Sequence, residues 1–317
     1  INSELQRFKG LIISRANSED FDLTKENISD IVNNKLKNNQ AKVSTRLVDL
    51  FDEYFTFKNT QIASSTKKKL KVFQKRIENF EDVYGTIDIK NIDKNFSYEF
   101  QKWLDEKGYA HNTKVKTLKV IKTICNFAID KGLKVNEGYN FISKGLTFKN
   151  VEHIHLNFAE LKAIINTELP IKEEDIARDW LIISCFTAQR ISDFLKFTEK
   201  NITKIQKILF LDITQEKTTS QVLIPLTIEV QANLKKYNGS FPPFFSKNKD
   251  SNEVIYNRLI KKVCRKAKIT NKVSVFKRNT TTNKYEFMEI EKCEAVTSHI
   301  GRRSFATNYY GEINTSL

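Results

Sequence analysis

The sequence predicts a mainly helical protein with a smaller mixed α and β part in its second half. Three observations lead to this fold class. The length of 317 residues suits two domains better than one core. Proline is absent before Pro170, and the chain upstream is rich in Lys, Glu, Leu and Ile at helical spacing. Beyond position 200, short apolar runs bounded by turn residues indicate strands.

The first half of the chain divides into a short leading segment and a helical domain. We expect residues 1–40 to form one or two short helices and residues 41–138 to form a compact bundle of four. The four apolar stripes of the bundle begin near Val48, Leu70, Phe96 and Val115. Helix caps are predicted at Thr24, Ser65-Thr66 and Asn112-Thr113. We interpret the aromatic residues of these stripes as core and not as a ligand site.

The second half is predicted to be a mixed domain over residues 152–317, joined to the first by a linker over residues 139–151. Gly138 and Gly145 lie near the ends of that linker. Helices are expected over residues 158–167, 176–184, 189–196 and 257–267, and strands over residues 208–214, 221–226, 273–277 and 285–290. The first two of these strands are expected to form one hairpin, and the last two to form another.

The charge of the chain favours a polyanionic partner. Its 53 Lys and Arg residues outnumber its 38 Asp and Glu residues, which gives a net charge of +15. Residues 1–40 are neutral, so the surplus lies further along. Two stretches are basic and contain no acid: one runs from Lys114 to Lys122 and the other from Arg258 to Arg278. Either stretch alone is equally compatible with a solvated helix face, but two in one basic chain favour nucleic acid.

Two helices of the bundle are predicted to face DNA. On the fourth helix the lysines fall opposite the apolar residues, and a run of lysines begins the second helix. Backbone amides at a helix N-terminus favour phosphate, as lysines do. We therefore expect double-stranded DNA to be contacted by Lys67, Lys68, Lys71, Lys114, Lys116, Lys119 and Lys122.

The cysteines and the apolar runs bear on the cellular compartment. The four cysteines lie far apart without Cys-x-x-Cys spacing, which predicts reduced, buried thiols and neither disulfides nor zinc. No run has the apolar length of a membrane span or the core of a signal peptide, so we expect a cytoplasmic protein without membrane association. The chain begins at Ile1 and not at Met, which suggests a fragment or a processed product.

Two segments of the second domain carry candidate chemistry. Arg190 lies in Thr-Ala-Gln-Arg-Ile-Ser-Asp, where a lone arginine beside Asp193 is most often a surface ion pair. About a hundred residues later, His299 and Arg302 are three apart in Ser-His-Ile-Gly-Arg-Arg-Ser-Phe-Ala-Thr, which places them on one face of a helix. His-x-x-Arg alone is common by chance. The two segments in this order carry more information than either one.

In this combination the sequence resembles the tyrosine recombinase (phage integrase) family. That family has its first arginine in Thr-Gly-x-Arg-x-Ser-Glu/Asp and a second box that reads His-x-x-Arg-His/Arg-Thr/Ser-Phe-Ala-Thr. Lys217, in the predicted turn between two strands, stands where the family keeps a hairpin lysine, although an ordinary charged hairpin tip would look the same. The second box and the Lys- and Asn-rich composition look most like integrases of Bacteroides-type mobile elements.

The resemblance implies a helical core-binding (SAM-like) domain followed by a mixed α/β catalytic domain, with residues 1–40 as the remnant of an arm-binding region. It also implies that DNA is cut and rejoined through a 3′-phosphotyrosine in a synaptic tetramer of protomers, with no metal or other cofactor. Arg190 and Arg302 would grip the phosphate, because planar guanidiniums bind two oxygens at once. Lys217 would protonate the leaving 5′ oxygen, and His299 would donate a hydrogen bond or exchange a proton with the nucleophile.

The sequence also departs from the family pattern. Ala188 replaces the usual glycine and Gln189 a common apolar residue. Neither the later Gly-His or Gly-Trp segment nor the nucleophilic tyrosine is found, and we expect Tyr309 and Tyr310 to be packed and too near Arg302 to serve. The catalytic domain is therefore expected to stop before the nucleophile and to bind DNA without cleaving it.

Three hypotheses remain from the sequence. The first is a recombinase whose nucleophile segment is missing from this chain. The second is a DNA-binding accessory or regulatory protein derived from a recombinase and without cleavage activity. The third, a helical protein with an unrelated nucleic-acid role, requires all the motifs to be accidental. A tyrosine on the next helix encoded downstream would favour the first hypothesis, and a genuine stop would favour the second.

Overall fold

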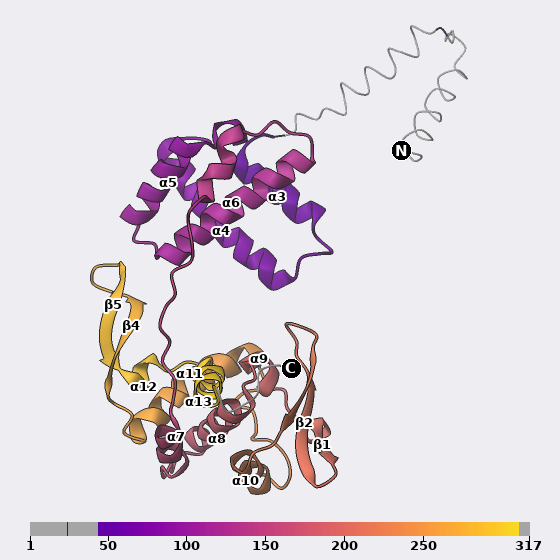
Figure 1. Ribbon diagram of the computed structural model, residues 1–317, viewed down its shortest axis with the longest axis vertical. Helices are drawn as coiled ribbons and strands as arrows, with labels where there is room; N and C mark the ends of the chain where they lie inside the picture. Colours follow the sequence, from indigo (N-terminus) through magenta and orange to yellow (C-terminus); the bar gives the residue numbers. More distant parts are fainter. Residues whose placement is uncertain (1–23, 25–43, 311–317) are drawn as a thin grey trace. The chain divides into compact units, whose positions relative to one another are not determined.

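A computed structural model describes residues 44–310 together with Thr24. The chain divides into two compact units, one up to Phe148 and one from Lys149 onward (Figure 1). Each unit has its own hydrophobic core. The helices predicted within residues 1–40, and the cap predicted for them, lie outside the described residues.

The first unit is a bundle of four helices, as the apolar stripes predict. The helices are α3 (Leu47–Phe57), α4 (Ser64–Tyr84), α5 (Lys94–Glu106) and α6 (His111–Asp130), with short 3-10 helices η1 (Ile89–Asn91) and η2 (Glu137–Ser143). The stripes meet in a core in which Phe51, Ile77 and Phe100 are fully buried. Phe80 packs edge-on against Phe100 and Trp103, with ring centroids 4.9 and 5.4 Å apart. The aromatic residues are core, as predicted.

Two predicted helix caps are wrong. Helix α4 is capped by Ala63 and α6 by Ala110, and neither alanine makes a side-chain cap hydrogen bond. Ser65-Thr66 and Asn112-Thr113 lie instead inside the first turns. These positions tolerate such residues, because the first N–H groups of a helix have no intrahelical partner to compete with. These two helices therefore begin without a side-chain cap, unlike α5, where Asp93 accepts a hydrogen bond of 2.8 Å from Phe96 N.

The predicted linker over residues 139–151 begins inside the first unit. Residues 139–143 belong to η2, where Ile142 is fully buried in the core of the bundle. Its carbonyl accepts a hydrogen bond of 3.0 Å from Ser97 Oγ on α5. Apolar periodicity does not indicate η2, because only one side chain of this short 3-10 helix, Ile142, is buried.

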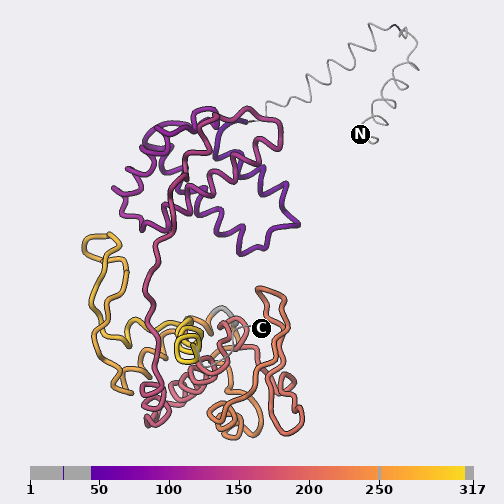
Figure 2. The backbone as a smooth tube through the Cα atoms, viewed as in Figure 1, coloured from indigo at the N-terminus to yellow at the C-terminus, as the bar shows by residue number. Residues whose placement is uncertain are grey.

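The second unit combines helices with two small antiparallel sheets. Its helices are α7 (Phe158–Ile165), α8 (Lys172–Thr187), α9 (Ile191–Phe194), η3 (Glu199–Asn201), α10 (Ile228–Lys236), α11 (Lys249–Lys266), α12 (Lys292–Ala295) and α13 (Ile300–Asn308). Its strands are β1 (Ile202–Ile205), β2 (Ile208–Thr214), β3 (Gln221–Pro225), β4 (Lys272–Arg278) and β5 (Tyr285–Glu291). The first three form one sheet in the order β1-β2-β3, and β4 pairs with β5. Both hairpins extend from the helical body of the unit (Figure 2).

Helix α8 is the centre of the second unit. It contacts α7, α9, α10, α11 and α13. Trp180, Leu181 and Ile183 are buried on it, and the ring of Trp180 stacks 6.1 Å from that of Phe241. Both hairpins were predicted, whereas β1 and α10 were not. The predicted helix over residues 189–196 shortens to the four residues of α9, because Ala188 takes a left-handed conformation and Arg190 an extended one.

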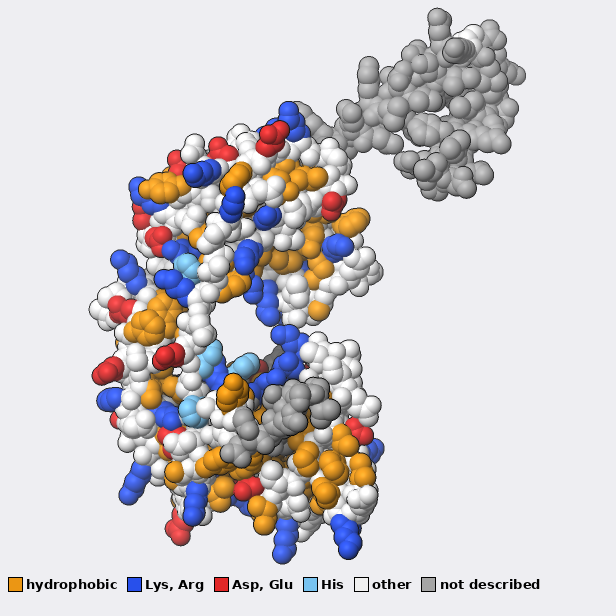
Figure 3. All heavy atoms as spheres, in the orientation of Figure 1, with side chains coloured by type: hydrophobic (Ala, Val, Ile, Leu, Met, Phe, Trp, Pro, Cys, Tyr) orange, Lys and Arg blue, Asp and Glu red, His pale blue; other side chains and the backbone are white. Residues whose placement is uncertain are grey.

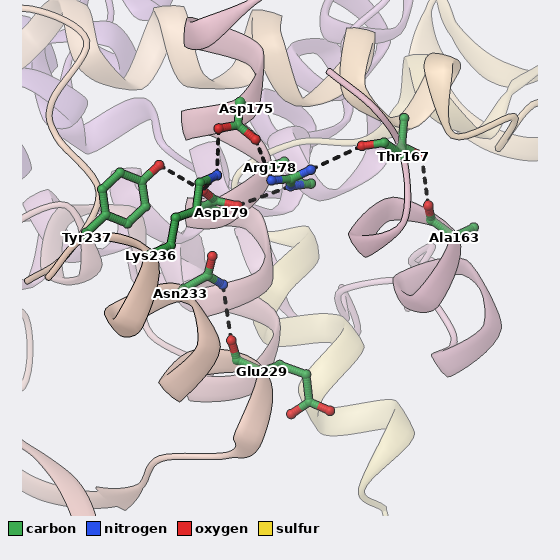
Figure 4. Close-up of polar contacts among 9 residues, drawn as sticks. All are labelled: Ala163, Thr167, Asp175, Arg178, Asp179, Glu229, Asn233, Lys236 and Tyr237. Atoms are coloured by element: carbon green, nitrogen blue, oxygen red, sulfur yellow. Dashed lines mark hydrogen bonds and ion pairs between the residues drawn. The ribbon is translucent and has the colours of Figure 1, made fainter. Parts of the chain in front are cut away.

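A network of charges fastens α10 to α8 (Figure 4). Asp179, whose side chain is almost fully buried, accepts hydrogen bonds from Tyr237 OH at 2.8 Å and from Arg178 Nε at 3.1 Å. Lys236 pairs with both Asp179 and Asp175. This network raises the pKa of the Tyr237 hydroxyl, first through burial and then through its bond to Asp179. The acids are matched by these partners, so we interpret the network as structural.

The cysteines are buried and free, as predicted. All four lie in hydrophobic surroundings, and burial raises the pKa of the Cys125 and Cys185 thiols to about 12. Among the described residues, no helix is both long and apolar enough to cross a membrane.

Candidate functional site

Arg302 is positioned by a close contact between two helices. Gly301, the residue before it on α13, lies directly against α8: a Cβ at this position would be 2.3 Å from Ser184 Oγ and 2.8 Å from the Ser184 carbonyl carbon. Because α13 lies this close, Arg302 reaches the C-terminal end of α8 and donates a hydrogen bond of 2.8 Å from Nη1 to the Ala188 carbonyl. The glycine between His299 and Arg302 therefore has a packing reason.

Arg190 reaches the same place from the loop after α8. It is the N-cap residue of α9, in extended conformation, and its side chain is 23% exposed. Its Nη1 lies 3.9 Å from Oδ2 of Asp193, a carboxylate that is 4% exposed. That oxygen accepts no hydrogen bond from any residue that the structure describes. The carboxylate of Asp193 therefore lies within ion-pair distance of the Arg190 guanidinium.

The guanidiniums of Arg190 and Arg302 repel each other and have one carboxylate, that of Asp193, to offset their charge. The pKa of Arg302 is lowered, first by burial and second by repulsion from Arg190, while Asp193 acts in the opposite direction. Two cations held beside one carboxylate leave an excess of positive charge in a partly desolvated place. A phosphodiester anion would relieve the repulsion between the two guanidiniums and accept hydrogen bonds from their remaining N–H groups.

Ala188 lies two residues before Arg190, and its carbonyl is the one that Arg302 binds. Its backbone is left-handed, with φ 57° and ψ 17°. It ends α8, a position that favours glycine because a Cβ costs roughly 1–2 kcal/mol in this conformation. The glycine that the family keeps here thus has a conformational reason, and its replacement by alanine puts strain at the carbonyl that Arg302 binds.

We predict that Ala188→Gly stabilises the protein by about 1 kcal/mol, because the substitution removes this left-handed strain. Urea unfolding followed by circular dichroism measures the change. Ala306→Gly is the matched control, since Ala306 is exposed within α13 and should lose about 1 kcal/mol as a helical alanine does. A loss of stability in Ala188→Gly similar to that of the control would contradict the strain argument.

Lys217 lies at the exposed tip of the β2–β3 hairpin, as predicted. Strand pairing ends at Thr214 and Gln221, so the tip is a short turn. The base of the turn is held against the α8–α9 loop: Glu216 N donates to Asp193 Oδ1 at 3.0 Å. Arg190 Nη1 donates to Gln215 Oε1 at 3.4 Å. The structure therefore brings the hairpin that carries Lys217 to the same loop as Arg190.

His299 precedes α13 as its N-cap residue and is exposed. It does not lie within the helix, so the prediction that it shares a helical face with Arg302 is only partly right. A second histidine, His153, lies nearby: burial, then repulsion from Arg303 and His299, lowers its pKa. The extended segment that carries His153 is fastened to α13, because Leu156 N donates to Ser304 Oγ at 2.8 Å. Figure 3 shows Lys, Arg and His side chains together on one edge of the second unit.

The predicted DNA-binding lysines belong to the first unit and divide by exposure. Lys68 and Lys71 on α4 and Lys116 and Lys119 on α6 are exposed. Lys114 pairs with Asp105 and is 17% exposed, Lys122 is half-buried, and Lys67 lies over the Phe55 ring at 5.9 Å. The exposed four are the best placed to follow a DNA backbone, and of these the Lys119 ammonium also lies over the Phe148 ring at 4.4 Å.

Sequence reasoning missed two residues that organise the site. Gln189 was noted only as a departure from the family pattern, and Gln215 only as part of the turn. The structure joins them by a hydrogen bond of 2.8 Å between Gln215 Nε2 and Gln189 Oε1. The available signal was a polar Gln189 at a position where the resemblance implies an apolar residue. In the part of the chain that the structure describes, no three His, Cys, Asp or Glu residues are grouped so that they could hold a metal ion.

Tyr309 and Tyr310, both predicted to be packed, behave differently. Tyr309 packs against Phe305 and Phe158, with ring centroids 4.8 and 5.5 Å away, and burial raises its pKa. Tyr310 is 86% exposed, so the prediction was wrong for this residue. It follows the end of α13 at Tyr309, where the helical face that packs on α8 no longer continues.

Comparison with known proteins agrees with this architecture. Residues 46–150 match the family described as the phage integrase SAM-like domain. Among solved structures, a lambda integrase fragment in a dimer bound to a COC′ core site superposes with a TM-score of 0.60 at 15% identity, covering 84% of this chain and 91% of that one. The integrase of transposon Tn1549 bound to circular intermediate DNA gives 0.60 at 17% identity, covering 85% and 88%.

A lambda integrase tetramer bound to a Holliday junction gives a TM-score of 0.59 at 12% identity, covering 96% of this chain and 82% of that one. No curated protein matches the sequence. The chain therefore has the fold of these integrases over most of its length, and its first unit matches the phage integrase SAM-like domain.

Proposed function

We propose that this protein is a site-specific DNA recombinase that cuts and rejoins double-stranded DNA through a 3′-phosphotyrosine, acting with other protomers of the same chain. The observation that carries the proposal is that Arg302 binds the carbonyl of Ala188 at 2.8 Å, two residues before Arg190, whose guanidinium lies 3.9 Å from the Asp193 carboxylate. The two arginines come from segments far apart in the sequence and meet at the end of α8. The shared fold and the basic first unit support the same function.

The chemistry follows from the charges at this site. The nucleophile is a tyrosine that is not identified among the described residues. Attack by its oxygen on the phosphorus forms the phosphotyrosine bond and breaks the bond to the 5′ oxygen. Arg190 and Arg302 stabilise the negative charge that grows on the non-bridging oxygens. The Lys217 ammonium gives its proton to the departing 5′ oxygen, which leaves as a hydroxyl. His299 donates a hydrogen bond to the phosphate or exchanges the proton of the nucleophile.

The experiment that tests this function uses the full-length protein and a suicide DNA substrate, a nicked recombination site whose cleaved strand loses a short fragment and cannot be rejoined. A covalent protein–DNA adduct that withstands denaturing gel electrophoresis is the expected result. Duplex binding without an adduct would favour the DNA-binding accessory protein instead. Absence of both would refute a DNA-directed function.

We predict that Lys116→Gln combined with Lys119→Gln lowers the salt dependence of duplex binding. Each lysine that neutralises a phosphate contributes about 0.9 to the slope of log affinity against log salt, so the slope should fall by roughly 2. Fluorescence anisotropy over a salt series gives the slope. Lys94→Gln with Lys102→Gln removes the same charge from exposed positions of α5 and should leave the slope near that of the wild type. Equal slopes in the two double variants would remove α6 from the DNA interface.

A further inference from the structure

A pair of glutamine side chains connects the β2–β3 hairpin to the loop that carries Arg190. Gln189 is 4% exposed, and its Nε2 donates to the Thr187 carbonyl at 2.9 Å. Its Oε1 accepts the hydrogen bond from Gln215 Nε2. Both polar atoms of this buried amide are therefore used, and one of them is used by the hairpin.

Gln215 also forms hydrogen bonds with Arg190 and with other residues of the turn. Its Oε1 accepts from Arg190 Nη1 at 3.4 Å and from Thr218 Oγ1 at 2.9 Å. Its backbone closes the turn, since Gln215 N donates to the Ser220 carbonyl and Thr219 N to the Gln215 carbonyl, both at 2.9 Å. Lys217 lies between these bonded positions. A movement of the Gln215 amide would therefore move both the turn and one contact of Arg190.

The hydrogen bond between the buried Gln189 amide and the half-buried Gln215 amide contributes little net stability. Burying an amide loses its hydration, and a hydrogen bond between two such groups returns a net of only about 1 kcal/mol. Two apolar side chains of similar size would hold the loop and the hairpin together about as well. What the amides add is direction, because a 2.8 Å hydrogen bond fixes the register of the hairpin on the loop.

We propose that Gln189 and Gln215 are positioning residues that hold Lys217 in register with Arg190 before DNA binds. This inference rests on the proposed recombinase function. Neither glutamine touches the phosphate: Gln189 acts through Gln215, and Gln215 acts through the turn. The hairpin is docked in the DNA-free chain, so less order remains to be gained when substrate arrives.

The first test measures the docking itself and needs no activity. Hydrogen exchange of the DNA-free chain reports the amides of Glu216 and Thr219, which are bonded to Asp193 and Gln215. Gln189→Met should make both exchange at least about tenfold faster, since removing the anchor lets the turn open locally. Gln221→Met is the matched control: Gln221 lies on the same hairpin and is exposed, and its side chain bonds Asp212 and not the α8–α9 loop. Unchanged exchange in Gln189→Met would overturn the proposal.

The second test asks whether the glutamines act through Lys217. The full-length protein is given two suicide substrates, one with the ordinary 5′ oxygen and one with sulfur at that bridging position, whose thiolate leaves without a proton. Gln189→Met should slow cleavage of the oxygen substrate by roughly tenfold or more, and Lys217→Ala by roughly a hundredfold or more. Both defects should largely disappear with the sulfur substrate, and the stability of Gln189→Met should stay close to that of the wild type.

The outcomes separate the two proposals. Equal slowing of Gln189→Met on both substrates would mean that the pair does not act through Lys217, and the inference would fall. Failure of the wild type to cleave either substrate would count against the proposed recombinase function, whereas the exchange experiment would still decide whether the glutamines hold the hairpin.

Discussion

Arg302→Ala is expected to lower the yield of covalent protein–DNA adduct by at least about a hundredfold, while duplex affinity stays within a few-fold of the wild type. A charged donor aimed at a phosphate in a partly desolvated site contributes about that factor to the transition state. Most of the binding free energy, in contrast, is expected from lysines spread over the first unit. Single-turnover adduct formation on the suicide substrate, together with anisotropy titrations, measures the two quantities separately.

A second variant separates the effect of the shape of the Arg302 guanidinium from the effect of its charge. Arg302→Lys keeps the charge but loses the planar fork that both binds the Ala188 carbonyl and offers further N–H groups to a phosphate. We expect this variant to remain at least tenfold slower than the wild type, at the conservative end of what a misplaced cation costs. Arg265→Ala is a matched control, since Arg265 is 52% exposed and pairs with Glu291 and Glu294. Wild-type adduct yield in Arg302→Ala would refute the proposal that Arg190 and Arg302 bind the reacting phosphate.

The catalytic candidates could be predicted from sequence because each lies in a short local pattern. Arg190 and Arg302 are recognised by the residues immediately around them, and the structure brings the two together. Lys217 followed from the prediction of a hairpin, which the strand pairing confirms. Their assigned roles in catalysis remain proposals. Patterns of this kind work when the chemistry restricts the neighbours of a residue as well as the residue itself.

The contacts that hold these residues could not be predicted in the same way. The bond between Gln189 and Gln215 joins residues 26 positions apart and depends on where the β2–β3 hairpin packs, which no local pattern around either residue indicates. The shortening of α9 has a similar origin. A left-handed Ala188 interrupts a stretch whose apolar spacing continues through it.

The helices were predictable where one face is buried against a large core. In the first unit the apolar stripes located all four main helices, whereas the caps were misplaced because alanines precede the first turns. Short elements were missed for the opposite reason. Strand β1 has four residues and no buried one, so its sequence holds almost no alternation to detect.

Gly301→Ala is expected to destabilise the second unit by at least about 2 kcal/mol. Overpacking a tight contact commonly costs 1–3 kcal/mol, and here a methyl group would lie 2.7 Å from Ser184 Cβ and 2.8 Å from the Ser184 carbonyl carbon. A backbone atom in the last turn of α8 cannot turn away as a flexible side chain can. The two helices must separate, and Arg302 would move off the Ala188 carbonyl with them.

Thermal and urea unfolding of Gly301→Ala would show this loss as a fall in Tm of about 4–8 °C, given the size of the unit. Thr307→Ala is the matched control, because Thr307 is exposed on the same helix and should change stability by less than about 0.5 kcal/mol. Ser184→Ala combined with Gly301→Ala removes the nearest oxygen but leaves Cβ and the carbonyl carbon, so only a small part of the loss should return. Full recovery in that double variant would show that a movable hydroxyl, and not the approach of the two helices, makes glycine necessary beside Arg302.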